Sequence, residues 1–150
     1  MGVQVKGLPG ALVEGCVFCA ISVGRAPAEI VCQETGALAF LDIHPVAPGH
    51  TLVIPRRHAD SIAELDEEAA AAVMRLATRM ARALYRALQP DGLTLLQNDG
   101  RAAGQEVPHF HLHLIPRWYG DGLRMGRGLL RRPAESPAEI GRRIRAALGG

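Results

Sequence analysis

Three histidines recur at every second position of one short segment, and this spacing gives them a shared direction. His109, His111 and His113 alternate with apolar residues. Side chains two residues apart in a strand leave on the same side, so we expect the imidazoles on one face and the apolar residues on the other. An imidazole with its ordinary pKa of about 6.5 can act as a nucleophile, a proton donor or a metal ligand. The alternative is a half-buried strand whose polar side happens to be histidine.

Two cysteines separated by two residues, Cys16 and Cys19, can direct both sulfurs at one metal ion. Two histidines would complete a tetrahedral Cys₂His₂ site, for which zinc is the natural ion. The available partners are His44, His50, His58 and His109, and the spacing alone does not choose between them. One alternative is a redox dithiol, although the flanking sequence lacks the thioredoxin-like βαβ context. The other is a pair of buried cysteines that act as small apolar side chains.

A glycine-containing loop, residues 98–106, comes just before the histidine segment. Glycines allow backbone N–H groups to approach a phosphate closely. The loop is not a Walker loop, because the Gly-Lys-Ser/Thr ending is missing. An ordinary hairpin connection explains the local sequence equally well.

Apolar patterns predict the strands that position these groups. Strands are expected at 30–32, 37–41, 50–54, 93–97 and 108–115, with a turn at 34–36 between the first two and Pro116 closing the last.

Apolar residues at steps of three and four predict a long helix after Asp66, which would be its N-cap, with Pro90-Asp91-Gly92 as its end. Short helices are expected at 16–23 and 136–148, the latter with Ser136 as cap and Pro137 at its first position. This order of elements predicts an α+β fold, an antiparallel sheet with helices packed on one side.

Composition limits the class of protein. The chain of 150 residues fits one domain, and 48% hydrophobic with 21% charged residues is ordinary for a soluble globular protein. The formal charge of +2 argues against extensive nucleic-acid binding. There is no signal-peptide pattern and no apolar run of about 20 residues, so we expect no membrane span and a cytoplasmic location. Three cysteines do not suit a disulfide framework, and reduced thiols are expected.

The chain divides into three parts by pattern. We expect a flexible leader at 1–15, the folded domain at 16–117 and a C-terminal tail with a terminal helix at 118–150.

These motifs together resemble the histidine triad (HIT) nucleotide-binding family, in particular its bacterial Hint-like branch with a zinc site. The resemblance covers about Cys16 to Arg117. It rests on the His-x-His-x-His segment, on Phe40-Leu41-Asp42-Ile43, on the segment from Pro48 to His58, and on Gly104-Gln105. It implies a HIT-like fold, with a five-stranded antiparallel sheet, one long helix and short flanking helices. It also implies a homodimer whose sheets join and a purine nucleotide, AMP-like or GMP-like, bound beside the triad.

The resemblance further implies that His111 is the nucleophile. It would attack the α-phosphorus of a nucleoside phosphoramidate, an acyl-adenylate or a dinucleoside polyphosphate, and water would then cleave the nucleotidyl-histidine intermediate. Splitting the displacement in two makes each step easier. His113 and nearby backbone amides would neutralise the developing charge, and His50 would support the triad.

The family's other positions divide between nucleotide and metal. The resemblance implies apolar pocket walls at Val17, Phe18, Ile21, Phe40 and Ile43, a ribose contact at Asp42, and contacts to ribose or phosphate at Asn98, Gly104 and Gln105. Plain core packing is the alternative for the apolar residues, and turn formation before Pro45 is the alternative for Asp42. The implied structural zinc ligands are Cys16, Cys19, His58 and His109.

Two further residues, His44 and Glu106, have separate implications. His44 is expected to be a surface residue. Glu106 stands where relatives often carry Ser or Thr, so the leaving-group preference is open, because a carboxylate beside a phosphate would repel it.

Three classes of function are compatible with these residues. A hydrolase or transferase that works through His111 is favoured by the intact triad. A non-catalytic nucleotide-sensing or regulatory dimer would use the same pocket. A nucleic-acid binder would use the tail arginines Arg124, Arg127, Arg131 and Arg132, for which a solvated tail is the simpler explanation.

Overall fold

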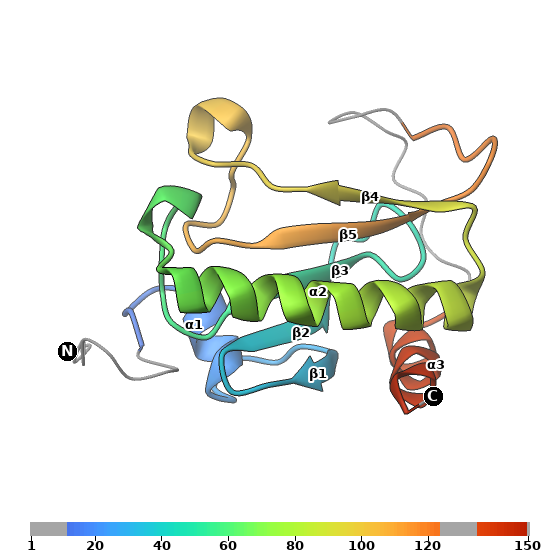
Figure 1. Ribbon diagram of the computed structural model, residues 1–150, viewed down its shortest axis with the longest axis horizontal. Coiled ribbons are helices and arrows are strands. Elements are labelled where there is room, and N and C mark those ends of the chain that lie inside the picture. Colours follow the sequence, from blue (N-terminus) through green and yellow to red (C-terminus); the bar gives the residue numbers. More distant parts are fainter. Residues whose placement is uncertain (1–11, 124–134, 150) are drawn as a thin grey trace.

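Five strands form one antiparallel sheet in the computed structural model, which describes residues 12–123 and 135–149 (Figure 1). The elements in chain order are α1 (Val17–Ser22), β1 (Ile30–Gln33), β2 (Ala37–Leu41), β3 (Thr51–Pro55), the 3₁₀ turn η1 (Ile62–Glu64), α2 (Glu67–Leu88), β4 (Gly92–Leu96), the 3₁₀ turn η2 (Arg101–Ala103), β5 (Leu112–Arg117) and α3 (Pro137–Leu148). The strand order is β1-β2-β3-β5-β4, and all neighbours are antiparallel. The predicted α+β fold with its five-stranded sheet is therefore confirmed.

The long helix α2 begins and ends through local backbone chemistry. The Asp66 side chain accepts a hydrogen bond from the Ala69 N–H at 2.7 Å, as expected of an N-cap. At the other end Gln89 takes a left-handed conformation with φ of 50°, and its N–H donates to the Tyr85 carbonyl. The helix therefore ends at Leu88, before the predicted stop at Pro90.

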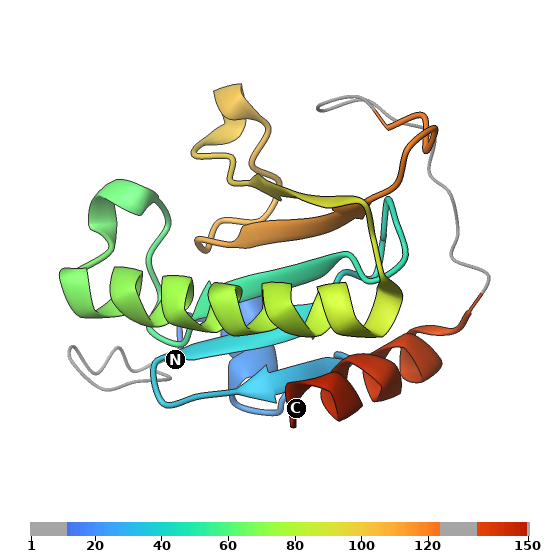
Figure 2. The same cartoon turned by 45° about the vertical axis from the view of Figure 1, so that its right-hand side comes forward.

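Strand side chains alternate between two apolar layers. In β2, Ala37 and Ala39 face α2, whereas Leu38 and Phe40 lie in the layer that includes α1. Helices α2 and α3 pack together on one face of the sheet (Figure 2). The prediction that helices pack on one side only is wrong, because β2 and β3 are buried on both faces and α1 helps to cover the second.

Strand β5 lies two to four residues later than the prediction of 108–115. After Pro55 the chain turns away from the sheet, so the Phe110 N–H donates to the Ala59 carbonyl at 2.7 Å rather than to a strand partner. Pro116 does not close the strand. It lies beyond the three residues, Leu112–Leu114, that pair with β3, where one side of β5 has no strand neighbour in the described sheet.

The ends of the chain are described in part. Leu12 and Val13 pack against the α1 layer, while residues 1–11 of the predicted leader lie outside the described residues. Ser136 caps α3 by accepting from the Glu139 N–H at 3.2 Å, as predicted. The four tail arginines at 124–132 also lie outside the described residues. Within the described ranges, no helix is both long enough and apolar enough to cross a membrane.

Candidate active site and metal centre

The histidine segment places its imidazoles on the sheet face that α1 covers. Its apolar residues Phe110, Leu112 and Leu114 belong to the layer under α2. His113 pairs with Leu52 of β3, which in turn pairs with Phe40 of β2, and both partners lie in the α1 layer. The predicted alternation of the two faces is confirmed. Phe40, Leu52 and His113 lie side by side across β2, β3 and β5 on the face that α1 covers.

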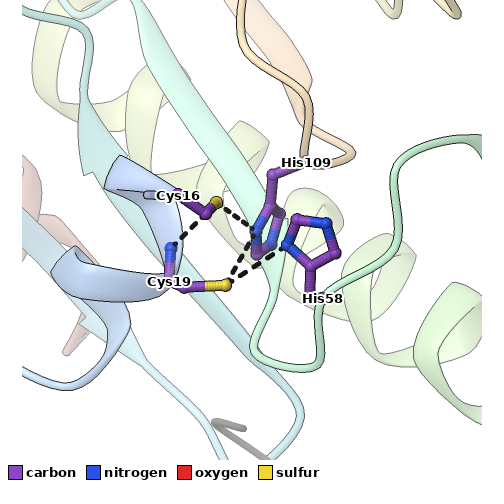
Figure 3. A group of neighbouring side chains, drawn as sticks. All are labelled: Cys16, Cys19, His58 and His109. Atoms are coloured by element: carbon purple, nitrogen blue, oxygen red, sulfur yellow. Dashed lines mark hydrogen bonds between the residues drawn. The ribbon is translucent and has the colours of Figure 1, made fainter. Parts of the chain in front are cut away.

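Four of the sequence-predicted residues come together at the start of α1 (Figure 3). Cys16 is the N-cap of α1 and its Sγ accepts from the Cys19 N–H at 3.4 Å, so both sulfurs lie on one side of the first turn. The Nδ1 atom of His109 lies 3.3 Å from the Cys16 Sγ and 3.5 Å from the Cys19 Sγ. The Nδ1 atom of His58 lies 3.3 Å from the Cys19 Sγ. All four atoms lie within 4.8 Å of one another.

The far nitrogens of both histidines show which nitrogen is free to bind a metal. His109 donates its Nε2–H to the Pro55 carbonyl at 2.9 Å, and His58 donates its Nε2–H to the Asp60 carboxylate at 2.5 Å. Both protons are therefore on Nε2, and both Nδ1 lone pairs face the sulfurs. A carbonyl or carboxylate behind the imidazole is the usual support of a metal-bound histidine.

Burial of the cluster sets the protonation states from which a metal ion would have to be bound. Desolvation raises the pKa of the Cys19 thiol to about 11, so a thiolate there needs a positive charge beside it. Burial lowers the pKa of His109 to about 4, which keeps the ring neutral, as a metal ligand must be. The two sulfurs and two nitrogens fit a tetrahedral Cys₂His₂ site for zinc and can hold a metal ion. A redox dithiol and inert packing explain neither histidine.

His111 has one nitrogen fixed and the other free. It donates its Nδ1–H to the main-chain oxygen of His109 at 2.9 Å, so in the neutral ring the lone pair is on Nε2. Among the described residues, Nε2 of His111 has no hydrogen-bond partner. Every fully buried side-chain nitrogen in these residues has a partner, so Nε2 is not fully buried and solvent can reach it. Phe18 packs edge-on against the ring at 5.1 Å between centroids. Among the described residues His111 belongs to neither group of side chains that could hold a metal ion, and 7% of the residue is exposed.

His50 and His113 form a directed chain of hydrogen bonds behind His111. The Val46 N–H donates to Nδ1 of His50 at 3.2 Å, so the proton of the neutral ring is on Nε2. This Nε2–H faces Nδ1 of His113 at 2.9 Å, which leaves His113 with its proton on Nε2. Burial lowers the pKa of His50, and burial together with the His50 ring lowers that of His113 to about 4. Both rings are thus neutral at pH 7.

Asp42 lies beside His50 and His113, but these three residues are not a metal site like the Cys₂His₂ cluster. One carboxylate oxygen accepts from the His44 N–H at 2.9 Å, and the other lies 3.5 Å from Nε2 of His50. Asp42, His50 and His113 are close enough to surround an ion. A metal would have to displace the proton on Nε2 of His50, whose other nitrogen already accepts from Val46. The geometry therefore favours a hydrogen-bond chain here.

The predicted apolar walls differ in exposure. Phe18, Ile21 and Phe40 are buried in the α1 layer, and the two phenyl rings pack edge-on at 5.4 Å. Val17 is 47% exposed and Ile43 is 76% exposed. The buried three pack within the α1 layer, and the exposed two leave apolar surface open to a ligand.

The loop before the triad is braced by Gln105. Its side-chain NH₂ donates to the main-chain oxygens of Asp60 at 2.9 Å and Val107 at 3.0 Å, and its Oε1 accepts from the Gly100 N–H at 2.7 Å. This side chain is committed to the protein, whereas the half-buried Asn98 amide makes no side-chain hydrogen bond among the described residues. Gly104 adopts φ of 95° at the end of η2. Glu106 is exposed, as is His44, which was expected at the surface.

Sequence reasoning missed two residues of the site. Asp60, the acceptor for His58, was detectable only as an acid two residues after a candidate ligand. Val46 takes part through its backbone N–H, for which its side-chain type gives no signal.

The fold and the site together define a histidine triad protein, and comparison with known families agrees. Residues 23–119 match the family model described as HIT domain. The chain therefore belongs to the HIT family.

Relatives and solved structures support this assignment. An uncharacterized HIT-like protein of Mycobacterium tuberculosis is 42% identical over 133 residues, which cover 89% of this chain and 92% of that protein. The hit protein of Bacillus subtilis is 44% identical over 111 residues, 73% of this chain and 77% of its own.

Among solved structures, a Zn-bound histidine triad family protein from Mycobacterium smegmatis is similar with a TM-score of 0.81 and 42% identity, covering 90% of this chain and 94% of that one. A histidine triad nucleotide-binding protein from Candida albicans has a TM-score of 0.66 and 30% identity, covering 81% and 85%.

Proposed function

We propose that this protein is a nucleotidyl hydrolase or transferase that cleaves at the α-phosphate of purine nucleoside phosphoramidates, acyl-adenylates or dinucleoside polyphosphates. The observation that carries the proposal is the free Nε2 lone pair of His111, whose Nδ1–H is held by the His109 carbonyl. A neutral imidazole whose other nitrogen is fixed in this way is oriented for attack on phosphorus.

The reaction proceeds in two displacements. Nε2 of His111 forms a bond to the α-phosphorus while the bond from phosphorus to the leaving nitrogen or oxygen breaks, and the leaving group takes a proton from solvent. Water then attacks the same phosphorus and loses a proton to solvent, the phosphorus–nitrogen bond to His111 breaks, and the nucleoside monophosphate is released. The Nε2–H of His113, set by the His50 bond, supplies a hydrogen-bond donor for the developing phosphate charge.

The proposed nucleotide contacts fall on exposed side chains of the site and on the buried side chains behind them. Val17 and Ile43 offer exposed apolar surface for the base, with Phe18, Ile21 and Phe40 behind them. Asp42 would accept from the ribose hydroxyls.

The phosphate side of the nucleotide would meet the loop after β4. Asn98 and the backbone at Gly104 and Gln105 would meet the ribose or phosphate.

The metal site would hold zinc through Cys16, Cys19, His58 and His109. When bound, zinc joins α1, the segment after β3 and the triad segment, which are far apart in the sequence. A Zn-bound structure is known for the M. smegmatis protein. Zinc has a structural role here, and no step of the reaction passes through it.

The protein would act as a cytoplasmic homodimer. Strand β4 is an edge of the sheet, and Leu95 on it is 51% exposed. Pairing of β4 with a second copy would join two sheets and cover an edge that invites association.

The test is incubation with an adenosine 5′-phosphoramidate and measurement of released AMP. Wild type is expected to release AMP and His111→Ala is not. His44→Ala is the matched control, since this exposed imidazole lies outside the site. Unchanged release by His111→Ala would remove the residue from the mechanism. Tight AMP binding without turnover by wild type would favour the nucleotide-sensing dimer instead, and unchanged AMP affinity of Asp42→Ala would contradict the ribose contact.

A further inference from the structure

His109 belongs to the metal site through its ring and to the active site through its main chain. Its Nδ1 faces both sulfurs, and its Nε2–H is held by the Pro55 carbonyl at 2.9 Å. The main-chain oxygen of the same residue accepts from Nδ1 of His111 at 2.9 Å. The ring is fully buried, so it has little room to move independently of its backbone. Contacts that fix the His109 ring therefore also fix the main-chain oxygen that orients His111.

His58, the second histidine of the cluster, is connected to the loop before the triad. Its Nε2–H donates to the Asp60 side chain at 2.5 Å. The main-chain oxygen of Asp60 accepts from Gln105 at 2.9 Å, and Gln105 accepts in turn from the Gly100 N–H at 2.7 Å. Three hydrogen bonds thus lead from a metal ligand to the middle of the loop proposed to meet the phosphate.

These two segments are placed mainly by side-chain hydrogen bonds, together with the main-chain bond from the Phe110 N–H to the Ala59 carbonyl at 2.7 Å. Residues 56–66 and 97–107 contain no strand, and their turns η1 and η2 lie at the same end of the sheet (Figures 1 and 2). Besides the Gln105 bond, the Ile62 N–H donates to the Asp99 carboxylate at 2.9 Å across the two segments. No sheet ladder would keep them in place if one end of this network loosened.

We propose that the metal centre positions both His111 and the 97–107 loop, so that metal binding and nucleotide binding are coupled. This rests on the proposed nucleotide site. Asp60 is a positioning residue, because it contacts a metal ligand and the loop brace but neither the metal cluster atoms nor the triad. The coupling is reciprocal by thermodynamic necessity: a metal that tightens AMP binding is itself bound more tightly by the same factor when AMP is present.

The first experiment uses Co²⁺ in place of zinc, since its visible spectrum reports on thiolate ligation. We expect AMP to bind metal-free protein about fivefold or more weakly than Co²⁺-loaded protein, and AMP to raise Co²⁺ affinity by the same factor. AMP is also expected to shift the cobalt bands. Equal AMP affinity of folded metal-free and loaded protein, with unshifted bands, would overturn the coupling.

The second experiment keeps all four ligands and so decides the matter even if metal-free protein unfolds. At saturating Co²⁺, Asp60→Ala is expected to bind AMP about threefold or more weakly, with smaller shifts of the cobalt bands, in keeping with the effect of residues behind metal ligands. Asp60→Asn retains an oxygen that can accept from His58 and is expected to restore both. Cys32→Ser is the thiol control, because Cys32 lies outside the cluster. AMP affinity unchanged in Asp60→Ala would refute the proposal.

The outcomes separate this inference from the proposed reaction. Coupling without any hydrolysis would leave the inference standing and overturn the enzymatic proposal. Hydrolysis through His111 with AMP binding indifferent to the metal would do the reverse. Absence of AMP binding by zinc-loaded wild type would overturn the nucleotide site and the coupling with it.

Discussion

Replacement of His50 by alanine tests whether the hydrogen-bond chain behind the triad sets the proton position on His113. The Val46 N–H fixes the His50 tautomer, and the His50 Nε2–H donates to Nδ1 of His113 at 2.9 Å. Without this donor, Nδ1 is left as an unsatisfied acceptor. The ring escapes only by moving its proton to Nδ1, after which Nε2 no longer donates to the phosphate.

The expected fall in kcat follows from the cost of leaving Nδ1 of His113 without a donor. An unsatisfied acceptor costs about 1–3 kcal/mol when fully buried, and His113 is half-buried, so we expect the lower part of the corresponding fall in kcat of about 5- to 150-fold if the transition state bears it. The apolar walls are untouched, and Asp42 loses its 3.5 Å approach to His50 but keeps the hydrogen bond from the His44 N–H, so KM should change less than kcat. The assay is steady-state release of AMP from an adenosine phosphoramidate, with zinc content and the unfolding midpoint measured on the same preparations.

A conservative variant separates the hydrogen bond from packing. In His50→Gln the terminal amide occupies roughly the place of Nε2 and can still donate to His113, so we expect most of the activity to return. Wild-type turnover by a folded His50→Ala protein would refute the proposed chain. So would a His50→Gln protein as slow as the alanine variant.

Three further outcomes are expected. The pKa of His113 is about 4 in the folded chain and about 6.5 when unfolded, so protons favour the unfolded chain and stability should fall as the pH drops from 6.5 towards 4. In urea titrations, His113→Gln should lose less stability than wild type between pH 7 and 5, and equal losses would contradict the assigned shift. Leu95→Arg on the β4 edge should convert the dimer to monomer by light scattering, and a persisting dimer would place the interface elsewhere. Glu106→Gln should raise kcat/KM for anionic over cationic leaving groups by about 2- to 5-fold, as expected of one exposed charge; an unchanged ratio would mean that Glu106 is turned away from the phosphate.

Local chemistry allowed much of the fold to be predicted from the sequence. The cap at Asp66 and the apolar stripe of α2 are local signals, and they were correct because both depend on residues within one or two turns. The face that α1 covers could not be predicted, because a helix of six residues carries too short a pattern to show its partner. The start of β5 depends on the course of the chain after Pro55, which only the tertiary fold decides.

The residue types of the site could be predicted from the sequence, but the contacts between these residues could not. Spacing alone left four histidines as partners for the two cysteines, and resemblance to the family selected the two that the fold brings together. The role of Gln105 in bracing its own loop could not be predicted, because its side chain donates to main-chain oxygens. One belongs to Asp60, which is distant in the sequence, and the other to Val107. Tautomers were out of reach of the sequence for the same reason: the His109, Pro55 and Val46 partners are backbone atoms.

The most direct measurement for the central claim is capture of the covalent intermediate. A single turnover with excess protein over an adenosine phosphoramidate is quenched in alkaline denaturant, which preserves a phosphorus–nitrogen bond, and the peptides are mapped by mass spectrometry. A nucleotidyl group on His111 that forms and decays at the rate of AMP release is the expected result. AMP release with no adduct at any time, or an adduct on another residue, would contradict attack by His111.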